Sequence, residues 1–438
     1  MKIYIYSISL LFFVFIHKTK AQDYLSFYNL GDYVIQTQDL SPILLPKYKV
    51  NFGTPLNVGM NLNSEITINQ ILVESGNNLK VDFDNLNLVA NETNIVNTNI
   101  VANIFILAFK INKGSISFFA NAKSNLTWQF SEDFTDIAAN GFGQSFSLSR
   151  EKINFTSYSE IGIGYTRTFL GDKLAVGLRL KALSGIAHTS LKENAQFGID
   201  INNNNFVWTA SATNATLNTS GVSDTENLSL FGDNAGFAMD LGLNYELNDK
   251  LSFNLSINDL GSINWKDNVT NYNIEDVNGG VYNGFDFEGS GNVQDEIEKA
   301  LNNIIGTTET NESFKTNISS RMFFSAKYKI SEKNVLRATY FNNNNNNPYI
   351  ETKPSFGLGY NRELNKSTYG IIASAGGINN GLRFGANFAF QLGFLQFYTA
   401  IDDISNIGGK VQEANSANFR FGMNFLFGYR GESKKMVK

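Results

Sequence analysis

The last long apolar stretch of the chain, Phe419–Tyr429, reads FRFGMNFLFGY and decides the fold class. Every second residue from Phe419 to Tyr429 is large and apolar, and the residues between them are mostly small, polar or basic. Such alternation predicts a β-strand whose two faces meet different surroundings. Its length matches the roughly 9–11 residues that a tilted strand needs to cross a bilayer. A strand of a soluble β-sandwich would alternate in the same way, so the choice depends on the rest of the chain.

The same alternation recurs at 173–181, 237–246, 251–258 and 382–391. In each stretch one parity is apolar, and the other carries small, polar and charged residues. The charged residues predicted to face inward are Lys173, Arg179, Lys181, Asp240, Glu246 and Arg383. A soluble sandwich would bury one face of each strand, whereas a wide barrel has a polar lumen and an apolar band against lipid. The chain is therefore predicted to be all-β, a transmembrane antiparallel β-barrel.

The strand number depends on one weak hairpin. Counting every alternating stretch gives about 16 strands, and the connections between them alternate between short and long. That order is typical of outer-membrane barrels, which have short periplasmic turns and long external loops. Assigning the hairpin at 194–212 to a loop would leave about 14 strands, and the short turns would still fall at the same end of the barrel. The sequence does not decide between about 14 and about 16 strands.

The chain divides into four expected segments. Residues 1–21 have the features of a secretory signal peptide, with a retained anchor as the alternative. The apolar core Ile3–Ile16 is too short for a comfortable membrane helix, and Ala21 would precede the cleavage site. Residues 22–49 are expected to form an N-terminal arm or lumen plug, 50–430 the outer-membrane barrel, and 431–438 a C-terminal tail.

The composition excludes several kinds of site. The chain has no cysteine, so a disulfide or a Cys-based metal site is impossible. Its net charge of −5, with both signs mixed, argues against a nucleic-acid partner. The sequence contains no phosphate-binding glycine loop. We therefore predict no cofactor.

Few residues offer catalytic or metal-binding chemistry. His188 is the only histidine after position 21 and lies near Ser190, which is weak support for a hydrolase that would also need an orienting group. Oxygen ligands that could hold calcium occur at Asp82, Asp84, Asn87, Asp402 and Asp403. Neither the Asp82, Asp84 and Asn87 group nor the Asp402-Asp403 pair completes a calcium-loop pattern. We predict no catalytic residue, no metal site and no enzymatic activity.

One helical pattern lies in the longest connection, 266–318. Val293, Ile297, Leu301 and Ile304 recur at helix spacing, and acidic residues occupy the first turns, where they suit the helix dipole. The helix could pack on the barrel rim, or it could serve as a lid or a docking element for a partner. Long loops can do either.

Three short segments resemble a known family. They are Gln22-Asp23, the stretch Asp259–Trp265 (DLGSINW) and the stretch Phe394–Asp403 (FLQFYTAIDD). On these residues the chain resembles a Bacteroidota outer-membrane barrel family of uncharacterised function, related in style to FadL-type transporters and PorV-like type IX secretion proteins. A FadL-like relationship implies the smaller strand number and an N-terminal plug. Asp259, Gly261 and Trp265 look like a structural corner at a strand end, and the resemblance carries over no active site.

Two functions of different kinds remain open. A FadL-like barrel would pass or hold a small apolar molecule, by way of the plug and a lateral opening. A scaffold would bind another envelope protein in envelope assembly or type IX-like secretion, with the 266–318 loop as its docking element. The polar lumen indicates a wet or plugged interior, and a general diffusion porin is a third possibility. In each case the expected location is the cell outer membrane, and its lipid is a partner.

Overall fold

The computed structural model describes most of the chain. The described residues are 24–75, 78–140, 145–192, 194–202, 207–222, 230–274, 278–282, 307–344, 354–376, 381–404 and 416–429. The expected signal peptide, the expected C-terminal tail and the loop helix with Val293, Ile297, Leu301 and Ile304 lie outside these residues. Those three expectations remain predictions.

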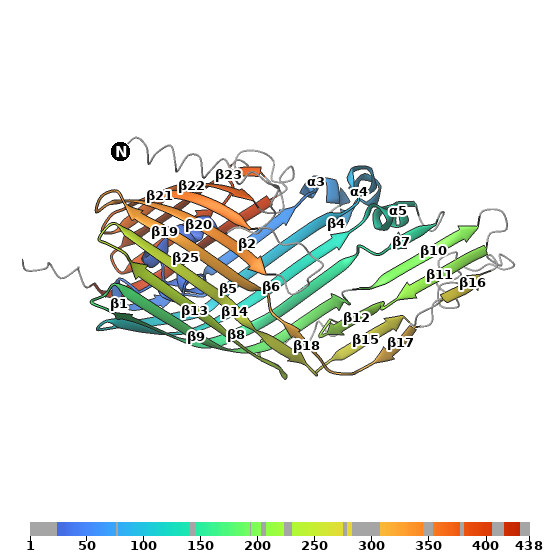
Figure 1. Cartoon of the computed structure of the whole chain (residues 1–438), viewed down its shortest axis with the longest axis horizontal. Helices are drawn as coiled ribbons and strands as arrows, with labels where there is room; N and C mark the ends of the chain where they lie inside the picture. The colour runs from blue at the N-terminus through green and yellow to red at the C-terminus, as the bar shows by residue number, and fades with distance from the viewer. Residues whose placement is uncertain are drawn as a thin grey trace, which may run out of the picture.

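The main body is a closed antiparallel β-barrel of 14 strands (Figure 1). In order around the barrel, the strands are β1 (Tyr48–Gly53) with β2 (Asn57–Ser64), β5 (Asn94–Ile111), β6 (Gly114–Phe130), β8 (Lys152–Phe169), β9 (Leu174–Leu191), β13 (Asn234–Glu246), β14 (Leu251–Trp265), β19 (Ser320–Lys329), β20 (Asn334–Asn344), β21 (Ser355–Glu363), β22 (Ser367–Gly376), β23 (Gly381–Leu392), β24 (Leu395–Ile401) and β25 (Ser416–Tyr429). β1 and β2 form one position, interrupted around Pro55, and both pair with β5 and β25. The last strand thus closes the barrel onto the first.

The hairpin at 194–212 does not belong to the barrel. Its strands β10 (Gln196–Asn202) and β11 (Val207–Thr213) join β7 (Phe146–Leu148) and β16 (Asn278–Tyr282) in a separate four-stranded sheet. The structure therefore selects the smaller strand number. Alternation shows that a strand exists, but it does not show which sheet the strand joins.

Burial follows the predicted alternation along the barrel strands. In β9, Ala175, Gly177, Arg179 and Lys181 are buried, whereas Val176, Leu178 and Leu180 are exposed. The outward parity of six other strands exposes Phe118, Ile163, Phe237, Leu255, Leu358 and Phe384. In β25, the buried Arg420 and Asn424 alternate with the exposed Phe419, Phe421 and Phe427. The outer surface is therefore an apolar belt that suits lipid, around a polar interior.

The two ends of the barrel differ. Six short turns join the strands at one end, here named the turn end (left in Figure 1). The other end, the loop end, carries the long connections. There the barrel sheet is extended by β12 (Thr216–Ser220), β15 (Val269–Ile274), β17 (Thr307–Thr310) and β18 (Phe314–Asn317), and β3 (Leu72–Ser75) pairs with β4 (Asn78–Val81).

Three short helices also lie at the loop end. They are α3 (Ile68–Ile71), α4 (Phe83–Val89) and α5 (Glu132–Asn140). An apolar cluster around the buried Leu86 and Phe130 joins them to the ends of β5 and β6. Among the residues that the structure describes, no helix has the length and apolar character needed to cross a bilayer.

Residues 24–47, here named the plug, fill the barrel interior. They form α2 (Leu25–Asn29) and two 3-10 helices, η1 (Gly31–Tyr33) and η2 (Ile35–Asp39). Such short helices leave many backbone carbonyls without partners, and side chains of the barrel wall donate to them. These bonds run from Arg337 to Tyr28, Gln396 to Tyr33, Asn258 to Leu40 and Thr166 to Pro42, at 2.8, 2.6, 2.9 and 2.6 Å. The plug is thus bonded to the wall on several sides.

Candidate functional site

The plug contacts the wall on one side through aromatic rings. The Tyr28 ring stacks on Phe323 with 4.9 Å between centroids, and Phe27 packs against Tyr398 at 5.7 Å. Phe323 and Tyr398 belong to β19 and β24, and both are buried. Burial of this apolar surface is the main favourable contribution to holding α2 in the lumen.

On the other side, Asp39 joins the plug to widely separated parts of the wall. Its Oδ1 lies 2.8 Å from Nη1 of Arg179 on β9, and its Oδ2 lies 3.6 Å from Nη2 of Arg420 on β25. Asn103 on β5 donates to the same Oδ2 at 3.3 Å. Burial alone would raise the pKa of Asp39, but Arg179 and the other cations nearby hold that pKa below its ordinary value. The carboxylate therefore stays charged at neutral and mildly acidic pH.

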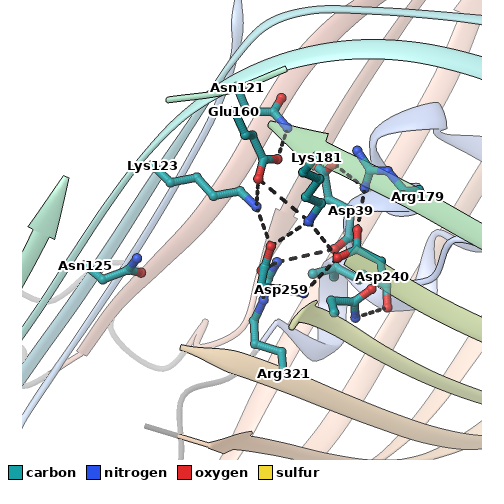
Figure 2. Close-up of polar contacts among 12 residues, drawn as sticks. Asp39, Asn121, Lys123, Asn125, Glu160, Arg179, Lys181, Asp240, Asp259 and Arg321 are labelled. Atoms are coloured by element: carbon teal, nitrogen blue, oxygen red, sulfur yellow. Dashed lines mark hydrogen bonds and ion pairs between the residues drawn. The ribbon is translucent and has the colours of Figure 1, made fainter. Parts of the chain in front are cut away.

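Asp39 belongs to a group of nine charged residues, here named the ion cluster, of which Figure 2 labels all but Arg420. The acidic members are Asp39, Glu160, Asp240 and Asp259, and the basic members are Lys123, Arg179, Lys181, Arg321 and Arg420. Apart from Asp39, they come from β6, β8, β9, β13, β14, β19 and β25, and all are buried. In Figure 2 the labelled side chains of the cluster point toward one another from neighbouring strands.

Asp259 is the centre of the ion cluster. Its Oδ1 lies 3.1 Å from Nζ of Lys123 and 2.5 Å from Nζ of Lys181. Its Oδ2 accepts from Nε of Arg321 at 3.0 Å and also from Nη2 of the same guanidinium. Lys181 in turn lies 2.6 Å from Oδ1 of Asp240. A single carboxylate thus contacts three buried cations, two of which also pair with Glu160 or Asp240.

A β-bulge directs Asp259 into the lumen. The register between β13 and β14 shifts so that Asp240 faces both Asn258 and Asp259. Asp259 has a φ of 62°, and its backbone N–H donates to Asp240 at 2.7 Å. Because the bulge adds a residue and interrupts the alternation, both Asn258 and Asp259 are buried. The bulge therefore places the Asp259 carboxylate inside the lumen, at the centre of the ion cluster.

Gly261 and Trp265 share the lumen face of β14 with Asp259. A Cβ at Gly261 would overlap the backbone of Phe237 on β13, so the residue permits close approach of the two strands. Trp265 is fully buried, and its Nε1–H donates to Oγ1 of Thr316 at 2.7 Å. The structure thus places a bulge, a close strand contact and an aromatic side chain in sequence along one face. That the three act together as a structural corner stays a prediction.

His188 packs beside Trp265, with 5.0 Å between ring centroids, and is buried. Its Nδ1 lies 2.9 Å from Oγ1 of Thr156, and its Nε2 lies 2.9 Å from Oγ of Ser190. A Ser–His nucleophile needs an acid that orients the imidazole, and Thr156 occupies that position here. The contacts of His188 therefore fit packing in the loop-end part of the lumen.

Four of the residues considered for calcium, Asp82, Asn87, Asp402 and Asp403, have structural partners. Asp82 caps α4 by accepting from the backbone N–H of Asn85 at 3.1 Å. Asp402 accepts from the backbone N–H of Ser26 at 2.6 Å and so ties the start of the plug to the wall. Within the described parts of the chain, no group of three or more His, Cys, Asp or Glu side chains is arranged to hold a metal ion.

Small cavities remain beside the plug. One is lined by the apolar or aromatic residues Tyr24, Phe27, Met60, Val101, Ala400 and Phe419, together with polar neighbours that include Arg420 and Asp402. Two others share Asn125, Tyr158 and Ser319, and amides and hydroxyls dominate their walls. Each cavity holds only about 10 Å³, room for about one water molecule, so the docked plug leaves a small apolar space next to α2 and small polar spaces closer to the loop end.

The sequence revealed only part of the ion cluster. It placed Arg179, Lys181 and Asp240 on the inward parity and singled out Asp259, but it did not join them into one site. Lys123 and Glu160 were missed because they lie in strands with weaker alternation. Asp39 was missed because the plug has no periodic pattern.

Comparison with solved structures finds other barrels at low identity. The chain is similar to the Pseudomonas putida toluene transporter TodX, with 9% identity, a TM-score of 0.43 and 93% of each chain covered. A TodX deltaS2S3 mutant monoaromatic hydrocarbon channel gives 10% identity and a TM-score of 0.44, covering 88% of this chain and 91% of that one. The Ralstonia pickettii toluene transporter TbuX gives 8% identity and a TM-score of 0.32, covering 90% of this chain and 94% of that one. These scores are too low to support a conclusion about function.

No curated protein matches the chain. A family of unknown function, DUF5723, matches residues 42–402. That span holds the barrel wall from β1 to β24 and every member of the ion cluster except Asp39 and Arg420. Because the match covers most of the chain, the protein belongs to the DUF5723 family.

Proposed function

We propose that the protein is an outer-membrane barrel that passes or holds a small apolar molecule, with the plug as its gate. The observation that carries this proposal is the small, mostly apolar cavity between α2 and the wall, lined by Phe27, Val101 and Ala400, which would admit such a molecule once α2 and its Phe27 ring move away from the wall. A general diffusion porin needs an open aqueous lumen, whereas residues 24–47 occupy this one.

The apolar belt and the closed strand pairing support a membrane position. Short turns face the periplasm in barrels of the bacterial outer membrane. The turn end is therefore assigned to the periplasm, and the loop end to the outside. A cleaved signal peptide at 1–21 would deliver the chain across the inner membrane.

Arg420 contacts both the apolar cavity and Asp39, the residue whose ion pairs hold the plug to the wall. Its guanidinium carbon lies 4.2 Å from the Phe27 ring centroid, and its Nη2 lies 3.6 Å from the Asp39 carboxylate. An apolar molecule that displaces the Phe27 ring would also remove the contact that holds this guanidinium in place. Occupation of the cavity would thus weaken one of the two ion pairs that retain the plug.

A non-enzymatic scaffold in envelope assembly or secretion remains the alternative. The observation in its favour is the structured loop end, where a separate four-stranded sheet and three helices stand beyond the barrel. A passage for small molecules does not need these additions. The docking helix expected within 266–318 would be part of this surface.

The transport proposal is tested by native mass spectrometry of protein extracted gently from its own membrane. The wild type is expected to carry a small apolar molecule that is released on collisional activation. Ala400→Leu adds volume inside the cavity and should lower the bound fraction about fivefold or more, because overpacking leaves no room for the ligand.

Ala386→Leu is the matched control, since Ala386 lies on the neighbouring strand β23 with outward parity. It should retain the bound molecule. A wild type without any adduct, or equal losses in the two variants, would count against an apolar ligand in this cavity.

A further inference from the structure

The six short turns share a sequence feature. In five of them a lysine directly precedes the first residue of the returning strand. These lysines, here named the lysine ring, are Lys113, Lys173, Lys250, Lys333 and Lys366. The sixth turn, between β23 and β24, has Gly393-Phe394 instead. The regular position calls for a structural or functional reason.

The five lysines occupy equivalent places in the barrel. The backbone carbonyl of each accepts from a backbone N–H in the neighbouring hairpin at 2.7 or 2.8 Å. The donors, in the same order, are Thr168, Glu246, Lys329, Glu363 and Gln391. Each lysine therefore continues the strand ladder, and the alternation puts its side chain on the lumen parity rather than the lipid parity. The ring surrounds the turn-end mouth of the lumen.

The charges of this ring are only partly balanced. All five lysines are exposed. Lys113 has one loose ion pair, at 4.0 Å from Asp172. Within the described chain, the other four form no ion pair. Glu246 and Glu363 lie across the ladder from Lys173 and Lys333 but form no ion pair with them. Lys250 lies across the ladder from Lys329, and like charges placed opposite each other destabilise a sheet. A surface that keeps such repulsion is suited to an anionic partner.

The spacing indicates a large partner rather than a small ion. The turns occur at every second strand, so neighbouring lysines are anchored about 10 Å apart. One small anion cannot bridge that distance, whereas an acidic surface or peptide can meet several of the lysines at once. The lumen behind the ring is occupied by the plug, where Nζ of Lys47 lies 3.5 Å from the Tyr33 ring centroid. An anion entering the barrel is therefore a poorer fit than a partner that covers its mouth.

The lumen parity also argues against lipid phosphate as the partner. Lipid headgroups would meet the outward parity, which at this end carries Arg167 and Arg362. We propose that the lysine ring binds an acidic protein segment, rich in Asp or Glu, that docks over the turn-end mouth. This inference goes beyond the proposed function and does not depend on the cargo.

The test measures binding of fluorescent poly-L-glutamate to the full-length protein in phosphatidylcholine nanodiscs. Four ring lysines are changed together, as Lys173→Gln, Lys250→Gln, Lys333→Gln and Lys366→Gln. The control removes four basic residues at the loop end, as Arg150→Gln, Lys192→Gln, Lys266→Gln and Lys315→Gln. The ring variant should bind about tenfold more weakly and lose most of its salt dependence, while the control changes less than about twofold. A heat-modified gel shift shows that each variant is folded.

Absence of binding to the wild type, or equal losses in the two variants, would overturn the proposal. A second arm repeats the comparison in nanodiscs that contain phosphatidylglycerol. If this lipid raises the melting temperature of the wild type but not of the ring variant, while poly-L-glutamate binds both equally, the lysines serve lipid and the proposal fails. If poly-L-glutamate binding alone depends on the ring, the proposal stands.

Discussion

At the scale of single residues, Asp259 contacts more buried cations than any other carboxylate of the ion cluster. It balances Lys123, Lys181 and Arg321, all of them buried. Burying charges costs free energy that mutual attraction barely offsets, but removing one partner of a buried group leaves the others uncompensated. The ion cluster should therefore be sensitive to loss of a single member, although it contributes little net stability as a whole.

Changing Asp259→Asn tests this expectation. Asparagine accepts the left-handed backbone conformation that Asp259 adopts at the bulge, so the change isolates the charge. The free energy of unfolding should fall by about 3–5 kcal/mol, because three cations lose their shared carboxylate. Urea unfolding in phospholipid vesicles measures the change.

Asp172→Asn is the matched control, since Asp172 also has a positive φ, 71°, but lies exposed in a turn. Its effect should stay within about 0.5 kcal/mol. Adding Arg321→Gln to Asp259→Asn should recover part of the loss. Equal effects of the two single changes would contradict a charge-balancing role for Asp259.

At the scale of elements, the plug is held by a combination of apolar and ionic contacts. Aromatic packing covers α2, and the carboxylate of Asp39 at the end of η2 connects to β9 and β25. The carboxylate of Asp39 can be neutralised while every aromatic ring of the plug and wall is kept. This change therefore offers a way to loosen the plug while the strands of the barrel stay paired.

Asp39→Asn should raise the population of the undocked plug. The loss of a charge-assisted contact predicts a rise of about tenfold to a hundredfold. Since the chain has no cysteine, Ser26→Cys introduces a single reporter at a fully buried plug position. Maleimide labelling of Cys at this site in intact membranes should be slow in the otherwise unchanged protein and faster by that factor with Asp39→Asn.

Asp32→Asn is the control, because Asp32 belongs to the plug but lies half-buried and outside the ion cluster. Labelling should change little with it. If Asp39→Asn and Asp32→Asn accelerate labelling equally, Asp39 has no special role as a latch.

The elements also show which parts of the structure a sequence can reveal. Strands such as β9 and β25 were predictable because lipid on one side and lumen on the other impose a strict alternation. The sheet to which β10 and β11 belong was not predictable, since pairing partners are set by long-range contacts. The ion cluster was hidden for the same reason: Lys123 and Asp259 are 136 residues apart in the chain. The bulge that turns Asp259 inward leaves no periodic signal at all.

At the scale of the whole molecule, the barrel is an apolar belt around a plugged polar lumen. The belt should tolerate charge only near its ends, because the cost of a charged side chain depends on its depth in the bilayer. Leu178 lies within the run of exposed outward residues of β9, from Val176 to Ala182, which we expect to cross the centre of the bilayer, where the cost is greatest.

Leu178→Arg should lower the free energy of folding into phospholipid vesicles by about 2–4 kcal/mol. Leu170→Arg places the same charge in the exposed turn before β9 and should cost about 0–1 kcal/mol. The two variants are compared by urea titration in the same vesicles. Equal costs would contradict a membrane-spanning belt at Leu178.

The central claim is that the plug closes the barrel, and the most direct measurement is single-channel conductance in a planar bilayer. The intact protein is compared with a variant that lacks residues 24–47. The intact barrel should show almost no steady current, whereas the deletion should give discrete open channels of a wide barrel, because the segment that occupies the lumen would be absent. An intact protein that conducts as well as the deletion variant would contradict the account.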